Sequence, residues 1–101
     1  MDIKSEMRKV IYDPIVSKAV EYNGNAELRG ITSKTGNMLN LENGAIYGEE
    51  LTIRMMSEDV QGIRQGDTIR IDGVDRYVLS VRPQENSGTV RIYYSDDEVI
   101  A

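Results

Sequence analysis

The chain contains no cysteine, histidine, tryptophan or phenylalanine, so its six tyrosines are its only aromatic residues. Without cysteine there are no disulfides, and nothing in the sequence indicates an oxidising compartment. Serine–histidine triads, thiol nucleophiles, and zinc or haem sites built on histidine or cysteine are also excluded. The glycines form no phosphate loop of the Gly-x-x-x-x-Gly-Lys-Ser/Thr type. We therefore expect no enzymatic activity and no bound metal or cofactor.

Long apolar runs are absent as well. No stretch approaches the roughly 20 residues that a membrane-spanning helix needs. Residues 1–11 carry too many charges for a signal peptide. The sequence thus predicts a soluble protein of the cytosol with no membrane contact.

Basic residues are outnumbered, because 12 Lys and Arg stand against 17 Asp and Glu and give a net charge of −5. A protein that binds nucleic acid by neutralising phosphates needs a basic face. Four arginines can build one if their strands are neighbours: Arg54, Arg70, Arg82 and Arg91. They are spread among acidic residues, which favours an ordinary mixed and solvated surface.

What the sequence does contain is alternation of apolar and polar residues, in segments separated by turn signals. A chain of 101 residues corresponds to one domain. We expect a mainly β fold, a small antiparallel β-barrel or sandwich with a short N-terminal helix and one short helical turn between strands. The expected parts are a helical arm (1–14) that ends at Asp13-Pro14, the barrel (15–94) and a solvated acidic tail (95–101).

Tight turns are predicted where residues that tolerate positive φ lie between strands. Strands over 15–22 and 26–32 flank one turn, with Leu28 and Ala26 facing inward. A second turn joins strands over 68–71 and 76–81, and a glycine turn starts the first of these. The residues that define the turns are Asn23, Gly24, Gly66, Asp67, Asp72 and Gly73. We expect positive φ at Gly66 or Gly73 at least.

The remaining strands are expected over 49–56 and 89–94, with Ser57 capping the short helical turn that Val60 and Ile63 anchor. Alternation also predicts the buried side chains. Those expected to be largely buried are Ile53, Ile69, Ile71, Leu79 and Val81.

The segment 33–48 differs from the rest, because glycines and asparagines interrupt its pattern. Sixteen residues is long for a loop in a compact domain. Three interpretations remain open: a protruding hairpin around Glu42-Asn43-Gly44, a loop that is mobile until a partner covers it, or an ordinary hairpin arm packed on its own barrel. The segment nevertheless carries five apolar residues, which we expect to contact a partner: Met38, Leu39, Leu41, Ile46 and Tyr47.

Paired carboxylates are the remaining candidates for chemistry. A hard cation can bind Asp72 with Asp75, or the cluster 96–98, but turn chemistry and solvation explain both sets more simply. Glu58 and Asp59 are a further candidate, as an acid/base pair. The preference for negative charge at the start of a helical turn explains these two residues equally well. Tyr93-Tyr94 invites a base-stacking interpretation, although Tyr77 and one of this pair are better explained as core aromatics.

The order of these features resembles the lambda-type phage head–tail joining (head completion) proteins, a family also found in prophages. The matching segments lie between residues 15 and 94: 26–31 (AELRGI), 51–54 (LTIR), 57–60 (SEDV), 64–71 (RQGDTIRI) and 77–83 (YVLSVRP). The N-terminal segment is shorter than in the lambda-type protein, and the closing tail is acidic rather than basic.

The resemblance implies a structural virion protein of the phage neck, assembled in the host cytoplasm. Such a protein joins the connector of the DNA-filled head, or its portal-side adaptor, to proteins at the end of the tail. It forms a homo-oligomeric ring when assembled, from subunits that can be monomeric when free. DNA then passes through the acidic lumen without specific binding, because like charge disfavours phosphate contacts. The alternative from another class is a small β-barrel module that binds nucleic acid or a peptide.

Overall fold

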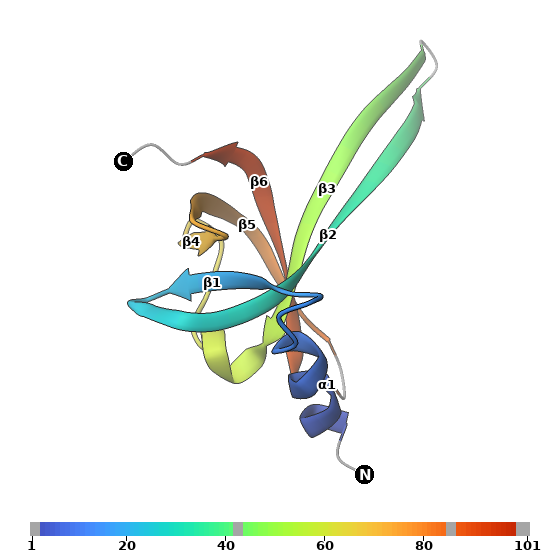
Figure 1. The fold of residues 1–101 in the computed structure, drawn as a ribbon. Coiled ribbons are helices and arrows are strands. Elements are labelled where there is room, and N and C mark those ends of the chain that lie inside the picture. Colours follow the sequence, from blue (N-terminus) through green and yellow to red (C-terminus); the bar gives the residue numbers. More distant parts are fainter. Residues whose placement is uncertain (1–2, 42–43, 85–86, 99–101) are drawn as a thin grey trace.

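A computed structural model of the chain (Figure 1) describes residues 3–41, 44–84 and 87–98, with side chains described at all of these positions except 35–50 and 96–98. Within these residues the order is α1 (Ile3–Ile11), β1 (Lys18–Tyr22), β2 (Asn25–Leu41), β3 (Gly44–Met56), the 3-10 helix η1 (Ser57–Val60), β4 (Thr68–Ile71), β5 (Val74–Gln84) and β6 (Thr89–Glu98). The strands close into an antiparallel barrel in the order β1-β2-β3-β6-β5-β4. The expected mainly β fold with one N-terminal helix and one short helical turn is confirmed.

Two tight turns reverse the chain where the sequence predicts them. Asn23 and Gly24 have φ of 53° and 82°, and Asp72 and Gly73 have φ of 53° and 83°. Positive φ at both central residues is the geometry whose twist matches that of the flanking strands. These turns set the registers Tyr22↔Asn25 and Ile71↔Val74. Gly66, which precedes β4, also has positive φ, at 96°.

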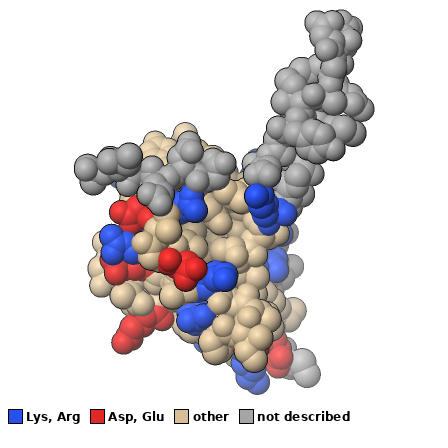
Figure 2. Space-filling view, turned by 45° about the horizontal axis from the view of Figure 1, so that its top comes forward, with Lys and Arg blue, Asp and Glu red and all other residues tan. Residues whose placement is uncertain are grey.

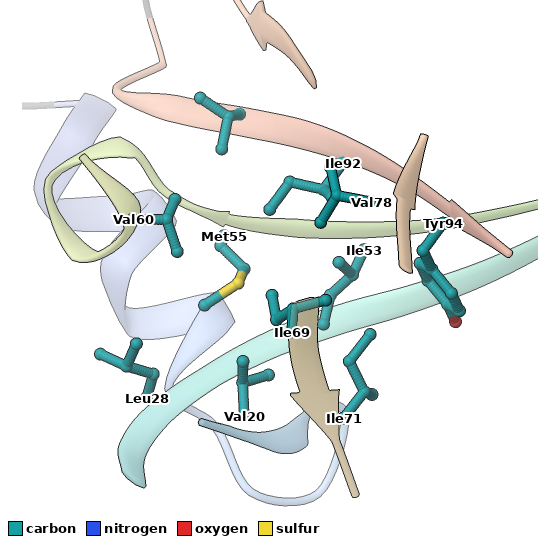
Figure 3. Close-up of a cluster of buried hydrophobic side chains, with 11 residues drawn as sticks. Val20, Leu28, Ile53, Met55, Val60, Ile69, Ile71, Val78, Ile92 and Tyr94 are labelled. Carbon is teal, nitrogen blue, oxygen red and sulfur yellow. The ribbon is translucent and has the colours of Figure 1, made fainter. Parts of the chain in front are cut away.

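The core fills the inside of the barrel, with side chains from every strand converging there (Figure 3). Its buried members are Val20, Leu28, Ile53, Met55, Val60, Ile69, Ile71, Val78, Val90, Ile92 and Tyr94. The expected burial of Ile53, Ile69 and Ile71 is confirmed, and Val81 and Ile63 are partly buried against the same cluster. Ala26, expected to face inward, is exposed beside the Asn23-Gly24 turn.

Leu79 is where the burial prediction is wrong. Its side chain is 46% exposed, whereas Val78 is fully buried. The register between β5 and β6 changes from Val78↔Tyr94 to Ser80↔Tyr93, so two steps along β5 correspond to one along β6. Such a bulge exchanges the inward and outward faces of a strand. It also explains why Tyr77, expected in the core, is 41% exposed.

The N-terminal helix packs on the outside of the barrel, against β2 and β3. Ile11 and Met56 are both fully buried without belonging to the interior cluster, whereas Ile3 and Val10 remain exposed.

Ser57 is the first residue of η1, and in the described structure no side chain caps that turn, so the expected Ser57 cap is wrong.

Two segments extend further as strand than the sequence predicts. Residues 33–41 and 44–48, expected to form a loop, belong to β2 and β3, which pair continuously from Ile31↔Arg54 to Leu41↔Gly44. Residues 95–98 of the expected acidic tail belong to β6, and Glu98 pairs with Arg76. Backbone hydrogen bonds across a ladder compensate for weak side-chain alternation in both places.

Candidate partner-binding surfaces

The most prominent feature is a two-stranded arm, defined here as residues 35–41 of β2 and 44–50 of β3. It projects away from the barrel in Figure 1. Pairing of β1 with β2 reaches only Gly30, and pairing of β6 with β3 begins at Leu51. Between Thr35↔Glu50 and Leu41↔Gly44, the described residues therefore form a ribbon without a third strand. The protruding hairpin is thus the interpretation that agrees with the backbone.

The arm contains all five apolar residues that the sequence singles out as contacts. Its register places Met38 opposite Tyr47 and Leu39 opposite Ile46, with Leu41 opposite Gly44 at the last described pair. Their side chains lie outside the described ones. The two outer edges of the ribbon carry backbone donors and acceptors that a further strand can pair with. The arm is therefore a candidate binding surface through its backbone as well as its composition.

A row of arginines crosses three neighbouring strands. Arg54 on β3 pairs with Arg91 on β6, and Arg91 pairs with Arg82 on β5. The neighbours of Arg54 and Arg91 along their strands lie in the core, and Val81, beside Arg82, packs against it, so all three arginine side chains point outward. We call this set the arginine row. Arg70, the fourth arginine considered for a basic face, lies on β4 and instead bonds Asp75 at 2.8 Å and approaches Glu21 at 3.9 Å.

Among the described side chains, the arginine row has little charge compensation within the subunit. The Nε of Arg54 is buried without a hydrogen-bond partner, and the Arg82 guanidinium lies 5.5 Å from the centre of the Tyr93 ring. Like charges directly opposite each other on neighbouring strands are destabilising. Elsewhere charges are mixed, and Figure 2 shows basic and acidic side chains interspersed on the face it presents.

Three of the carboxylates considered for catalysis or metal binding have structural partners. Glu58 pairs with Lys4 and Arg8 of α1, Asp59 accepts a hydrogen bond from Tyr12, and Asp75 pairs with Arg70. In the part of the chain that the structure describes, no three acidic side chains gather into a metal-binding group. The side chains of residues 96–98 lie outside it.

Of the adjacent tyrosines, Tyr94 lies in the core and Tyr93 faces outward. Burial raises the pKa of Tyr94. The base-stacking interpretation therefore applies to Tyr93 alone, which Arg82 already covers. None of the helices among the described residues is long and apolar enough to cross a membrane.

Sequence reasoning missed two long-range contacts that organise the barrel. Tyr22 donates to Asp67 at 2.9 Å, and Tyr12 donates to Asp59. Each joins segments more than 40 residues apart, so no local sequence pattern predicts either contact. The only available signal is that a half-buried tyrosine usually finds a partner for its hydroxyl.

Comparison with known proteins identifies the family. A search of curated proteins gave no match. The model of the phage head-tail attachment protein family matches residues 1–93, which is nearly the whole chain. The chain belongs to this family of virion proteins.

Proposed function

We propose that this member of the phage head-tail attachment family is a structural protein of the neck, which joins the connector of the DNA-filled head to the tail by forming a ring. Membership of the family supports the place in the virion. The observation that carries the joining role is the arm, which projects from a barrel whose own strands are all paired. In the ring, the barrels form the wall and the arms reach the head-side adaptor, tail-end proteins or neighbouring copies.

The apolar residues of the arm are the proposed contacts: Met38, Leu39, Leu41, Ile46 and Tyr47. Apolar side chains supply most of the favourable free energy when protein surfaces associate. A two-stranded ribbon outside a barrel is also only marginally stable by itself. Packing against a partner therefore both buries apolar area and fixes the conformation of the arm.

DNA passes through the ring without specific contact in this proposal. A net charge of −5 disfavours adhesion to phosphates, and the chain has no histidine or cysteine for the commonest catalytic chemistries. We accordingly propose a role in assembly with no catalysis, cofactor or metal.

The test is complementation in a phage that encodes this chain. Inactivating its gene should leave DNA-filled heads and finished tails separate, because the joint between them is missing. Adding the purified chain to that extract should restore infectious particles, counted as plaques and seen by electron microscopy. Empty heads, or normal joining without the chain, would contradict the proposal.

One observation favours the alternative of a nucleic-acid-binding module, namely the arginine row. Retention on heparin or DNA at low salt, lost when Arg91 is replaced by Glu, would support that alternative. A neck protein with an acidic surface should pass through such a column.

A further inference from the structure

The arginine row lies on the opposite side of the barrel from a face rich in acids. The closed order β1-β2-β3-β6-β5-β4 places β6, at the centre of the row, three strands from β1 in either direction. Arg91 on β6 and Glu21 on β1 therefore lie on opposite sides of the barrel. This relationship is independent of the arm, which continues β2 and β3 beyond the barrel.

The opposite face, which we call the acidic face, is built on β1, β4 and the start of β5. Glu21 and Asp75 flank Arg70, so two carboxylates share one guanidinium. Asp72, in the adjoining turn, is exposed and adds further negative charge. Beside these groups is a shallow depression of about 150 Å³. The residues lining it are Ala19, Val20, Glu21, Ala26, Arg70 and Gly73.

The two faces are complementary in charge. The arginine row is wholly basic, whereas the acidic face carries more carboxylates than basic groups and has a depression lined partly by small residues. A protein of net charge −5 that gathers three arginines into one row carries its negative excess elsewhere on its surface. The surface that such a row fits is thus present on another copy of the same chain.

We propose that, in the ring, the arginine row of one subunit docks on the acidic face of the next. This inference rests on the proposed ring. Rings form when one surface of a subunit binds a different surface of its neighbour, and the rotation between copies closes. Carboxylates of the neighbour relieve the repulsion between Arg54, Arg91 and Arg82, and the depression receives a guanidinium. The arm remains available for the head and the tail.

Cross-linking tests this contact directly, because the chain has no cysteine of its own. The variant Arg91→Cys/Glu21→Cys carries one thiol on each face. Because β6 and β1 are three strands apart in either direction around the barrel, a short bis-maleimide should join the two thiols only between copies. Treated virions should give a ladder of cross-linked multiples of this chain on a denaturing gel. Two controls should give no ladder: the single-cysteine variants, and Arg91→Cys/Lys9→Cys, whose second thiol replaces the exposed Lys9 of α1.

Charge exchange provides the second test. Arg91→Glu should reduce complementation at least about tenfold, because like-charge contacts across an interface are strongly unfavourable. Arg91→Glu/Glu21→Arg should restore it, since the charges of this one pair are exchanged at each interface of the ring and Arg70 keeps its closer partner Asp75. Lys9→Glu, which changes the net charge equally, should have no effect. Circular dichroism and thermal unfolding show whether each variant is folded.

The outcomes separate this inference from the proposed function. Failure of the wild-type chain to complement overturns the neck role itself. Infectious particles that contain the double-cysteine chain but give no ladder overturn only the pairing of these two faces. The pairing of the two faces is also overturned if Arg91→Glu/Glu21→Arg is folded but complements no better than Arg91→Glu alone.

Discussion

The Tyr12 hydroxyl donates a hydrogen bond to the Asp59 carboxylate, 47 residues further along the chain. Tyr22 makes the equivalent bond to Asp67 at 2.9 Å, 45 residues away. Together they fix the connection between β3 and β4 at two points, one beside α1 and one beside β1. Ion pairs from Lys4 and Arg8 to Glu58 reinforce the first point. This connection follows Met56, at the opposite end of β3 from the arm, so both bonds fix the end of the barrel that lies away from the arm.

The Tyr12–Asp59 bond should make stability depend on pH above the neutral range. Burial, with a further contribution from Asp59, raises the pKa of Tyr12 from its ordinary value of 10.0 to about 12. The folded state therefore holds this proton more tightly than the unfolded state. The stabilisation is fully present below about pH 10 and is lost as pH rises towards 12. Urea unfolding between pH 8 and about 11.5 measures it.

Replacing Tyr12 with Phe removes the hydroxyl while keeping the ring. We expect a loss of about 1–2 kcal/mol at neutral pH, because Asp59 loses a donor to its charged group. The difference from wild type should shrink as pH rises above about 10. Tyr22→Phe is the matched control, and the pKa of Tyr22 is likewise raised by burial and Asp67. A difference that stays constant with pH would show that the hydroxyl contributes through packing alone.

Gly30 is required for close packing inside the barrel. A Cβ there would lie 2.6 Å from Cδ1 and Cγ1 of Ile53 and 2.9 Å from Cγ of Met55. We expect Gly30→Ala to cost about 1–3 kcal/mol, the usual cost of overpacking a core. Ile53→Val removes one of the clashing atoms, so the double variant should lose less than the sum of the two single losses. Additive losses in urea unfolding would exclude this steric explanation.

The β5 bulge makes opposite predictions for two adjacent residues. Val78→Ala should destabilise the protein by about 2 kcal/mol, because it removes two buried methyl groups and leaves a cavity. Leu79→Ala should change stability by less than about 0.5 kcal/mol, since its side chain is 46% exposed. A larger loss for Leu79 than for Val78 in the same unfolding experiment would contradict the register of β5.

The sequence predicts best those turns and buried positions that are determined by residues close together in the chain. Asn23-Gly24 and Asp72-Gly73 specify their turns because few other residue pairs accept positive φ at both positions. Ile53, Ile69 and Ile71 follow from alternation within single strands. Leu79 could not be predicted, because the bulge depends on how β5 pairs with β6, a strand that follows it in the chain.

The candidate surfaces were only partly predictable for the same reason. The sequence allows a basic face of four arginines but favours a mixed solvated surface. Only the strand order shows that β6 lies between β3 and β5, and only the register shows that Arg70 on β4 pairs with Asp75 instead of joining the row. Gly36, Asn37 and Asn40 weaken the strand pattern of the arm, whose structure depends on pairing with residues 44–50. Pairing between residues distant in the chain cannot be predicted from the alternation of apolar and polar residues in either segment alone.

Shortening the arm should separate folding from joining. Thr35 and Glu50 are directly paired, so replacing residues 36–49 with Asn-Gly closes the ribbon with a two-residue turn in the same register. Pairing of β3 with β6 begins at Leu51 and stays intact, so the barrel should keep its circular dichroism and cooperative unfolding. A shorter connection also costs less closure entropy.

Because the apolar contacts are gone in this shortened variant, DNA-filled heads and separate tails should accumulate in the complementation assay. A matched variant that keeps the length but replaces the five apolar residues with Ser tests whether composition, rather than reach, is responsible. Normal yields of infectious particles from both variants would show that the arm is dispensable and that joining depends on the barrel faces or the termini.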